Sequence, residues 1–403
     1  MAHILIAYKQ FPAPGVGHAG GESVYRLMEL LHQRGHRLTL VARIQEAERP
    51  LLPTTAALCD RVVTVPHHRS LPGPRPLALL RSYLALRHAT QRTLRDVRPD
   101  VLHIEFAQTG AVVLGLRGAP TSIRAHDVNW FLMEQQAARQ RGPARWRSRG
   151  LRAVFLALEP RLYRRFDLVA AISEGDRRLL AARCAPQPVL LLPLAPAFHP
   201  AADAPAAVPR GANVLFVGAM SRAYNSEAVL WFLDAIWPAV AQAAPEARFY
   251  IVGADPPASV RARHDGERVF VVGFVPDLAP WYQAADVVVA PLQVAGGLLQ
   301  KVVDAMGMGI PVVATTVSNH GLGATPGEHL LIADAPGPFA EAVIRLLRCP
   351  EERERLGQAG QRFVTAHYDP EVLVPQWEAA LLQLLDARNE KASPLQGEMR
   401  HRE

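Results

Sequence analysis

A cation and a carboxylate stand three residues apart, just behind a pair of glycines. Gly296 and Gly297 precede a predicted helix that carries Lys301 and Asp304. Positions three apart share a helix face, and a glycine pair lets a ligand approach the backbone where the free N–H groups of a helix start favour an anion. A cation for a diphosphate and a carboxylate for sugar hydroxyls are what a nucleotide-sugar site requires. The alternative is an ordinary exposed pair of opposite charges.

The segment around these residues resembles a known donor site. Residues 296–315, GGLLQKVVDAMGMGIPVVAT, are similar to the donor-binding segment of family 4 of the retaining glycosyltransferases, which have the GT-B fold. Two positions depart from the family pattern. Many members carry an acidic residue where this chain has Gly296, and the second acid, usually glutamate, is Asp304 here. The resemblance implies that Lys301 and the backbone of 296–298 hold the diphosphate, and that Asp304 holds the ribose hydroxyls.

Further segments extend the resemblance over most of residues 1–380. The pair at 20–21 matches the glycines that cap the first helix beneath the cleft, residues 124–129 match a cleft motif of the first domain, and residues 216–225 match the loop that faces the diphosphate. The implied catalytic residues are His126, Lys301 and Arg222, without a metal ligand. The implied donor-binding residues are Gly20, Gly21, Gly218, Asn225, Gly296, Gly297, Leu298 and Asp304, and the acceptor-side candidates are Glu105 and Asp127.

Each of these polar residues has a plainer interpretation. His126 contacts the donor sugar or the acceptor, or it is a packed residue at a strand end. Asp127 orients His126 or is the N-cap of the next helix, and the cap is favoured. Asn225 could instead be a turn residue or a cap. Glu105 faces the acceptor or is an exposed acid at a strand end, and the exposed acid is favoured.

The whole-chain composition sets the outer bounds. A length of 403 residues predicts two domains, and 49% hydrophobic with 20% charged residues is ordinary for a globular chain. Three dispersed cysteines give neither a disulfide framework nor metal-ligand spacing. A strand is expected from residue 3, which leaves no room for a signal peptide, and no apolar run reaches the ~18 residues of a spanning helix. The expectation is a cytoplasmic protein, soluble or peripheral to a membrane.

Basic charge is concentrated between Arg139 and Arg165. This segment holds nine arginines and a single acid, Glu159, with apolar residues such as Trp146 and Leu158 interleaved. Basic and apolar residues at helical spacing fit a helix that lies on an anionic membrane surface, and they also fit a solvated basic face. Nucleic acid is not expected as a partner, because no recognition motif accompanies the charge.

The order of predicted elements indicates an α/β protein with two doubly wound, Rossmann-like domains facing each other across a cleft, and the resemblance implies that this is the GT-B fold. Six strands are expected within residues 3–172 and six more within 213–332, with a Pro/Ala-rich boundary at 193–209. The domains are predicted at 1–194 and 195–369. A last helix at 370–386 is expected to cross back to the first domain, and residues 387–403 are expected to be a disordered tail.

A competing motif stands near the start of the chain. Residues 15–20, GVGHAG, match the dinucleotide fingerprint, and Arg43 ends the next strand where a 2′-phosphate could bind. Six residues separate the motif from the first strand, whereas the fingerprint's first glycine should end that strand. A nicotinamide-dependent oxidoreductase is therefore one alternative, and a non-catalytic relative acting as a binding protein is another.

The reading that the sequence favours is a retaining, metal-independent glycosyltransferase. No cofactor is expected, and the substrate would be a UDP- or GDP-linked sugar. The acceptor would be a glycan, a lipid-linked glycan or another small molecule in polysaccharide or glycoconjugate biosynthesis. The protein would work in the cytoplasm, free or on the inner face of the membrane.

Overall fold

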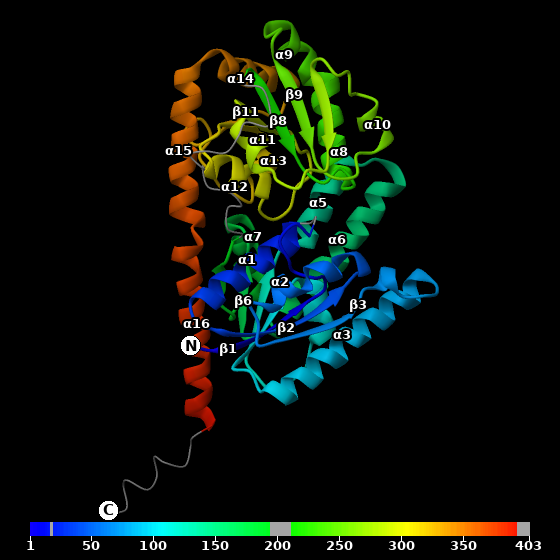
Figure 1. Cartoon of the computed structure of the whole chain (residues 1–403), viewed down its shortest axis with the longest axis vertical. Coiled ribbons are helices and arrows are strands. Elements are labelled where there is room, and N and C mark those ends of the chain that lie inside the picture. Colours follow the sequence, from blue (N-terminus) through cyan, green and yellow to red (C-terminus); the bar gives the residue numbers. More distant parts are fainter. Residues whose placement is uncertain (17–18, 194–210, 393–403) are drawn as a thin grey trace, which may run out of the picture.

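The computed structural model describes residues 1–16, 19–193 and 211–392. Two parallel sheets form the centres of two α/β domains, stacked one above the other in Figure 1. The predicted fold class is confirmed. The predicted domain boundary and most of the predicted tail lie outside the described residues.

The first sheet has seven strands in the order β3-β2-β1-β4-β5-β6-β7. Its strands alternate with helices because buried apolar runs alternate with amphipathic segments. All six predicted strands are present, and β7, only three residues long, is additional. The strands are β1 His3–Tyr8, β2 Arg37–Ile44, β3 Arg61–Pro66, β4 Val101–Glu105, β5 Thr121–Ala125, β6 Leu168–Ala171 and β7 Val189–Leu191. The α-helices are α1 Ala19–Gln33, α2 Leu52–Ala56, α3 Arg75–Val97, α4 Ala107–Val113, α5 Asn129–Arg139, α6 Gly142–Tyr163 and α7 Glu174–Cys184.

The second sheet has six strands in the order β10-β9-β8-β11-β12-β13, and it contains all six predicted strands. Its strands are β8 Asn213–Val217, β9 Arg248–Val252, β10 Val269–Gly273, β11 Val287–Ala290, β12 Val312–Ala314 and β13 Leu331–Ile332. Its α-helices are α8 Ala223–Trp231, α9 Trp237–Ala243, α10 Ala258–Arg261, α11 Ala279–Gln283, α12 Gln300–Gly307, α13 Thr316–Asn319, α14 Pro336–Arg348 and α15 Pro350–Tyr368.

The last helix, α16 (Pro370–Ala392), returns to the first domain and runs down its side in Figure 1. Val374, Trp377 and Leu381 join the apolar core that β1, β2 and α1 form on one face of the first sheet. The helix continues past residue 386, where the disordered tail was expected to begin, so that boundary was wrong. The polar character of residues 387–392 does not prevent them from extending a helix whose earlier turns are anchored.

The strand order places a functional site at a definite edge. In each sheet the order reverses beside the first strand of the domain, β1 in one and β8 in the other, and ligands of doubly wound sheets bind at the carboxyl ends of the strands at such a point. The carboxyl ends of the two sheets face each other. The side chains that follow β1, β4, β5 and β8 therefore meet between the domains.

Candidate active site

Lys301 is a buried cation aimed at the loop after β8. Its Nζ donates a hydrogen bond to Asn225 Oδ1 at 2.7 Å and lies 4.1 Å from the centre of the Phe216 ring. Burial lowers the pKa of Lys301 to about 7. A Cβ placed on Gly218 would lie 2.9 Å from both Lys301 Nζ and Asn225 Nδ2. Lys301, Asn225 and Gly218, predicted from separate segments, thus form one cluster, and the glycine leaves room for the ammonium group.

Asp304 lies one turn further along α12. It is 4% exposed, against 9% for Lys301, so the interpretation of these two residues as an exposed ion pair is wrong. Gln300 Nε2 donates to Asp304 Oδ1 at 2.6 Å. Burial, reinforced by the nearby charge of Asp304, raises the pKa of Tyr282 well above its ordinary value. Asp304 is therefore held in a packed polar environment on the buried side of the helix.

Glu105 was expected to be exposed, and this expectation is wrong. The carboxylate is completely buried at the end of β4. Arg124 Nε donates to its Oε2 and Arg124 Nη2 to its Oε1, both at 3.0 Å, while His103 and His126 bond to Oε1 and Oε2 at 3.1 and 2.7 Å. Burial opposes ionisation, but the charge of Arg124 and the histidine hydrogen bonds outweigh it and hold the pKa of Glu105 well below its usual range. Sequence reasoning did not identify these donors: Arg124 and His126 reach Glu105 because β5 pairs with β4, and His103 stands two residues before it on β4 itself.

His126 stands at the end of β5, facing the cleft, and is 5% exposed. Burial lowers its pKa to about 4, although Glu105 opposes the shift, so the imidazole is neutral at physiological pH. The Phe106 ring stacks on the imidazole at 3.7 Å between centroids.

Phe106 and Lys9 belong to the site and were missed by the sequence analysis. Phe106 has a φ of +72°, a left-handed conformation that a bulky residue adopts only when its surroundings impose it. Lys9 Nζ lies 3.9 Å from the centre of the Phe106 ring and donates to Gln108 Oε1 at 3.1 Å. Burial lowers the pKa of Lys9 to about 8. Lys9 directly follows β1, where the strand order reverses, and this position could have indicated a site residue from the sequence.

The glycine pair at the start of α1 packs against this aromatic group. A Cβ on Gly20 would lie 3.1 Å from Phe106 Cζ and 3.2 Å from the hydroxyl of Tyr8. Gly21 is buried beside it. The pair thus lies beneath the cleft. Gly20 is required there because a side chain would contact Phe106.

Asp127 is not the N-cap of α5, contrary to the favoured interpretation. The cap position is Val128, and the carboxylate of Glu159 on α6 accepts hydrogen bonds from the backbone and side-chain nitrogens of Asn129. Burial raises the pKa of Asp127 to about 6, while the charges of Lys9 and Arg222 counteract the rise. Asp127 therefore lies between cations supplied by the two domains.

Arg222 is exposed at the N-terminal end of α8. Its charge acts on both Lys9 and Asp127 across the cleft. Lys9 and Arg222 thus bring positive charge from the two domains to the same carboxylate.

The loop before α12 is docked on the first domain. Gln135 of α5 exchanges two hydrogen bonds with the backbone of Ala295, at 2.9 and 3.0 Å. Gly297 has a φ of +63°, and a Cβ there would lie 2.5 Å from the carbonyl oxygen of His126. Leu298 is buried, 6% exposed. The backbone of this loop consequently touches the segment that carries His126.

Gly296 faces Leu132, which explains the missing acid. A Cβ at position 296 would lie 2.5 Å from Leu132 Cδ2, so the leucine occupies the space that a side chain there would need. We expect Gly296→Glu, which restores the family's usual acid, to lower turnover rather than raise it, because overpacking displaces the loop. Adding Leu132→Ala should recover activity in the double variant. An increase in turnover with Gly296→Glu alone would contradict this explanation.

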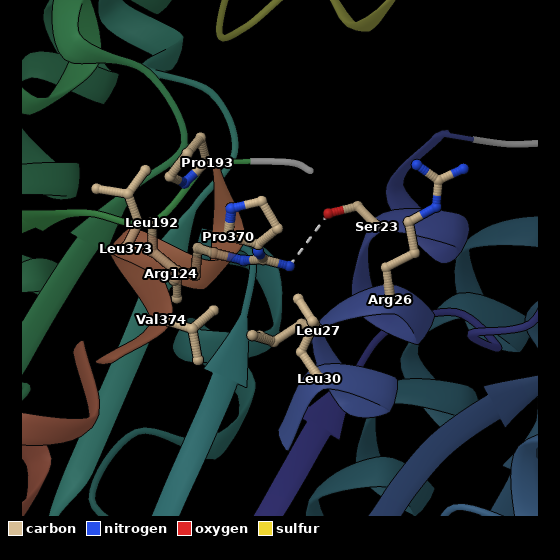
Figure 2. Close-up of a pocket in the computed structure, with 10 residues that line it drawn as sticks. All are labelled: Ser23, Arg26, Leu27, Leu30, Arg124, Leu192, Pro193, Pro370, Leu373 and Val374. Carbon is tan, nitrogen blue, oxygen red and sulfur yellow. Dashed lines mark hydrogen bonds between the residues drawn. The ribbon is translucent and has the colours of Figure 1, made fainter. Parts of the chain in front are cut away.

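A small pocket lies behind the buried cluster (Figure 2), between α1 and the start of α16. Arg124 crosses it, and its Nη2 donates to Ser23 Oγ at 3.2 Å. The other walls are mostly apolar, from Leu27, Leu30 and Val374. Arg124 forms an ion pair with Glu105 on one side and lines this pocket on the other.

The dinucleotide interpretation gains no support. Arg43 is 3% exposed, donates to the carbonyl oxygen of Lys9 at 2.6 Å and stacks over Tyr83 at 4.0 Å. It is committed to packing and is not presented to a 2′-phosphate. Residues 17–18 of the motif lie outside the described residues, and α1 begins only at Ala19, well beyond the end of β1.

Comparison with known proteins agrees with this geometry. The model of Glycosyltransferase Family 4 matches residues 20–194, and that of Glycosyl transferases group 1 matches residues 211–349. The chain therefore belongs to the glycosyltransferases of the group 1, family 4 type, with the GT-B fold. An uncharacterized 44.6 kDa protein in the cps region of Klebsiella pneumoniae is 25% identical over 165 residues, which are 39% of this chain and 42% of that protein.

Solved structures share the fold over nearly the whole chain. The sucrose-phosphate synthase of Thermosynechococcus elongatus has a TM-score of 0.68 at 20% identity, covering 97% of this chain and 99% of that one. Anabaena HepE in complex with UDP-glucose has a TM-score of 0.67 at 17% identity, covering 96% and 100%. Among the helices of the described residues, none has the length and apolarity needed to cross a bilayer.

Proposed function

We propose that the protein is a retaining, metal-independent glycosyltransferase that moves a sugar from a nucleoside-diphosphate sugar to a glycan or a lipid-linked acceptor. The observation that carries the proposal is Lys301. Within the described residues its hydrogen bond goes to the neutral Asn225, and burial alone shifts its pKa. A buried ammonium without a paired carboxylate is costly, and an anionic ligand would offset that cost.

The proposed reaction also requires a cation beside the diphosphate. Breaking the bond between sugar and diphosphate develops negative charge on the leaving group, and fixed donors aimed at that group lower the barrier. Lys301 would supply one such donor, and Arg222 and the loop backbone at 296–298 would supply others. Asp304 would bind the ribose hydroxyls. The resemblance to this family implies a front-face attack, in which the leaving phosphate takes the acceptor's proton.

The donor is proposed to be UDP-linked. Structures of HepE, similar in fold, are described as complexes with UDP and with UDP-glucose, at 16–17% identity to this chain. The test is a melting-temperature shift with UDP, GDP and NADP, followed by a transfer assay in which NMR reads the anomeric configuration of the product. A shift with UDP and a retained configuration support the proposal, and a shift with GDP alone keeps the glycosyltransferase but rejects the UDP-linked donor. A shift with NADP alone favours the oxidoreductase, no shift with any nucleotide favours a binding protein, and an inverted product rejects retention.

A lipid-linked acceptor would be met at the cytoplasmic face of a membrane, as a step in polysaccharide or glycoconjugate biosynthesis. Helix α6 suits this task. Trp146 and Leu158 on it are 70% and 59% exposed, with Leu151 and Val154 also exposed. Arg145, Arg147 and Arg149 are exposed among them. Each basic residue near an anionic surface contributes ~1 kcal/mol, and exposed apolar side chains add interfacial burial.

We expect the protein to co-sediment with vesicles that contain anionic lipid and to be released in part by high salt, since salt screens the arginines but not the apolar contacts. Replacing Arg145, Arg147 and Arg149 with glutamine should weaken binding about as much as high salt does, at an unchanged melting temperature. Arg152 is left intact because it pairs with Glu134 at 3.3 Å.

The control removes the same charge elsewhere. Replacing Arg92, Arg95 and Arg362, three exposed arginines on α3 and α15, with glutamine should leave vesicle binding unchanged. If wild-type protein stays in the supernatant with anionic vesicles at low salt, α6 is only a solvated basic face. A soluble acceptor would then be favoured.

A further inference from the structure

Every acceptor position of the Glu105 carboxylate is occupied. A carboxylate offers about four acceptor sites. Oε1 receives Arg124 Nη2 and His103 Nε2, and Oε2 receives Arg124 Nε and His126 Nε2. The carboxylate is ionised, because the charge of Arg124 and the histidine hydrogen bonds outweigh the effect of burial on its pKa. An ionised carboxylate only accepts hydrogen bonds, so both histidines must donate to it through Nε2–H.

This fixes the tautomer of His126. A neutral imidazole carries one proton, and in His126 that proton is on Nε2, 2.7 Å from Glu105 Oε2. Nδ1 then has a free lone pair. No residue in the described ranges donates a hydrogen bond to it, and the stacked Phe106 ring restricts rotation of the imidazole. His126 also lies against the donor loop, since its carbonyl oxygen is the atom nearest to a Cβ on Gly297.

We propose that Glu105 is a positioning residue that holds His126 in the Nε2–H tautomer, so that Nδ1 is a fixed hydrogen-bond acceptor for a substrate hydroxyl. The hydroxyl belongs to the transferred sugar or to the acceptor, and the inference rests on the proposed function. Both sources need the same chemistry, an O–H that donates to Nδ1. A histidine of the opposite tautomer would present an N–H donor there, and the hydroxyl would have to accept from it instead of donating.

A further set of hydrogen bonds lies behind His103, the second histidine bound to Glu105. His103 Nδ1 lies 3.3 Å from Ser122 Oγ, and Trp377 of α16 donates to the same oxygen at 3.2 Å. The Ser122 oxygen thus links His103 to α16 on the side of the cluster away from His126.

The first test needs no variant of Glu105 and no substrate. Nitrogen-15 NMR of histidine-labelled protein at pH 7, with the His126 signals assigned by their loss in His126→Asn, should show a protonated Nε2 and an unprotonated Nδ1. A protonated Nδ1 would overturn the proposal. This result stands even if no nucleotide sugar is turned over, in which case it is the proposed function that fails.

The second test is a double-mutant cycle measured by turnover. Glu105→Gln and His126→Ala should each lower kcat at least tenfold, and the double variant should lose no more than about twofold beyond the worse single variant, because Glu105 acts through His126. Multiplicative losses would overturn the proposal. If His126→Ala raises the Michaelis constant of the donor, the hydroxyl belongs to the transferred sugar. If it raises that of the acceptor, the hydroxyl belongs to the acceptor.

The control is Thr90→Val, which removes a buried hydrogen bond of the first domain outside this cluster, from the Thr90 hydroxyl to the carbonyl oxygen of Leu86. It should stay within threefold of the wild-type kcat at an unchanged donor Michaelis constant. A loss equal to that of Glu105→Gln would mean that the loss of any buried hydrogen bond in the first domain inactivates the protein, and would also overturn the positioning role. If Glu105→Gln does not fold, the tautomer measurement on the wild-type protein decides.

Discussion

Lys301→Met is expected to lower turnover by about tenfold or more, because it removes a charge-assisted contact to a group whose negative charge grows in the transition state. Methionine keeps an unbranched apolar stem over the Phe216 ring, so packing is largely conserved and the effect reports the charge. The melting temperature should be unchanged or higher, since the ammonium is buried beside a neutral amide. Wild-type turnover in this variant would remove Lys301 from the site.

The protonation of Lys301 gives the same prediction a second readout. Burial places its pKa at about 7, below the ordinary value of 10.5. Between these values the unfolded chain binds the extra proton, so this residue makes the free protein more stable as pH rises through that window. A bound diphosphate would raise the pKa again. Calorimetry near pH 8, in buffers of different ionisation enthalpy, should therefore show proton uptake on binding of UDP, up to about one proton per nucleotide.

Lys301→Met should abolish this proton uptake. Uptake that persists in the variant would assign it to another group, of which Lys9, with a pKa of about 8, is the nearest candidate. Uptake absent from the wild type as well would show that the diphosphate does not contact Lys301.

Gly297→Ala is expected to reduce turnover by about a hundredfold, because a displacement of about 1 Å at a reacting centre can cost that much. The added methyl would lie 2.5 Å from the carbonyl oxygen of His126, and backbone at that distance must move. The loop would then separate from the segment that carries His126. The measurement is kcat with the donor at saturation.

Gly323 supplies a matched control. Its φ is +69°, close to the +63° of Gly297, but a Cβ there would meet no atom within 4 Å. Both alanine variants should lose about 1–2 kcal/mol to left-handed strain, and Gly297→Ala should lose more because of its contact with His126. Only Gly297→Ala should lose activity. Equal losses of turnover would mean that backbone strain, and not the contact with His126, is responsible.

The sequence predicted the fold and half of the site. Strand and helix periodicity located both sheets, and the string from Gly296 to Thr315 located Lys301 and Asp304, because those residues lie within one continuous segment. Glu105 was misjudged because its burial depends on Arg124 and His126, which reach it from β5, while His103 lies on its own strand. No local pattern encodes a partner that is brought by the pairing of strands.

Phe106 and Leu132 were missed for a related reason. An aromatic residue after a strand is predicted to be core, and only the folded backbone shows its φ of +72° and its stack on His126. Leu132 has an ordinary place in the α5 pattern, and its contact with Gly296 exists only because the two domains meet. Asp127 was assigned to a cap that Glu159 supplies from thirty residues away.

The helix that returns to the first domain constrains how the chain is made. Trp377, at 0% exposed, completes an apolar core whose other members include Ile4 and Ile6, close to the N-terminus. During synthesis that face of the first sheet stays uncovered while the whole second domain is translated, although N-terminal domains generally fold first. The newly made first domain therefore waits for its last helix. In that interval the exposed face is where a chaperone, or a misfolded contact, would compete with α16.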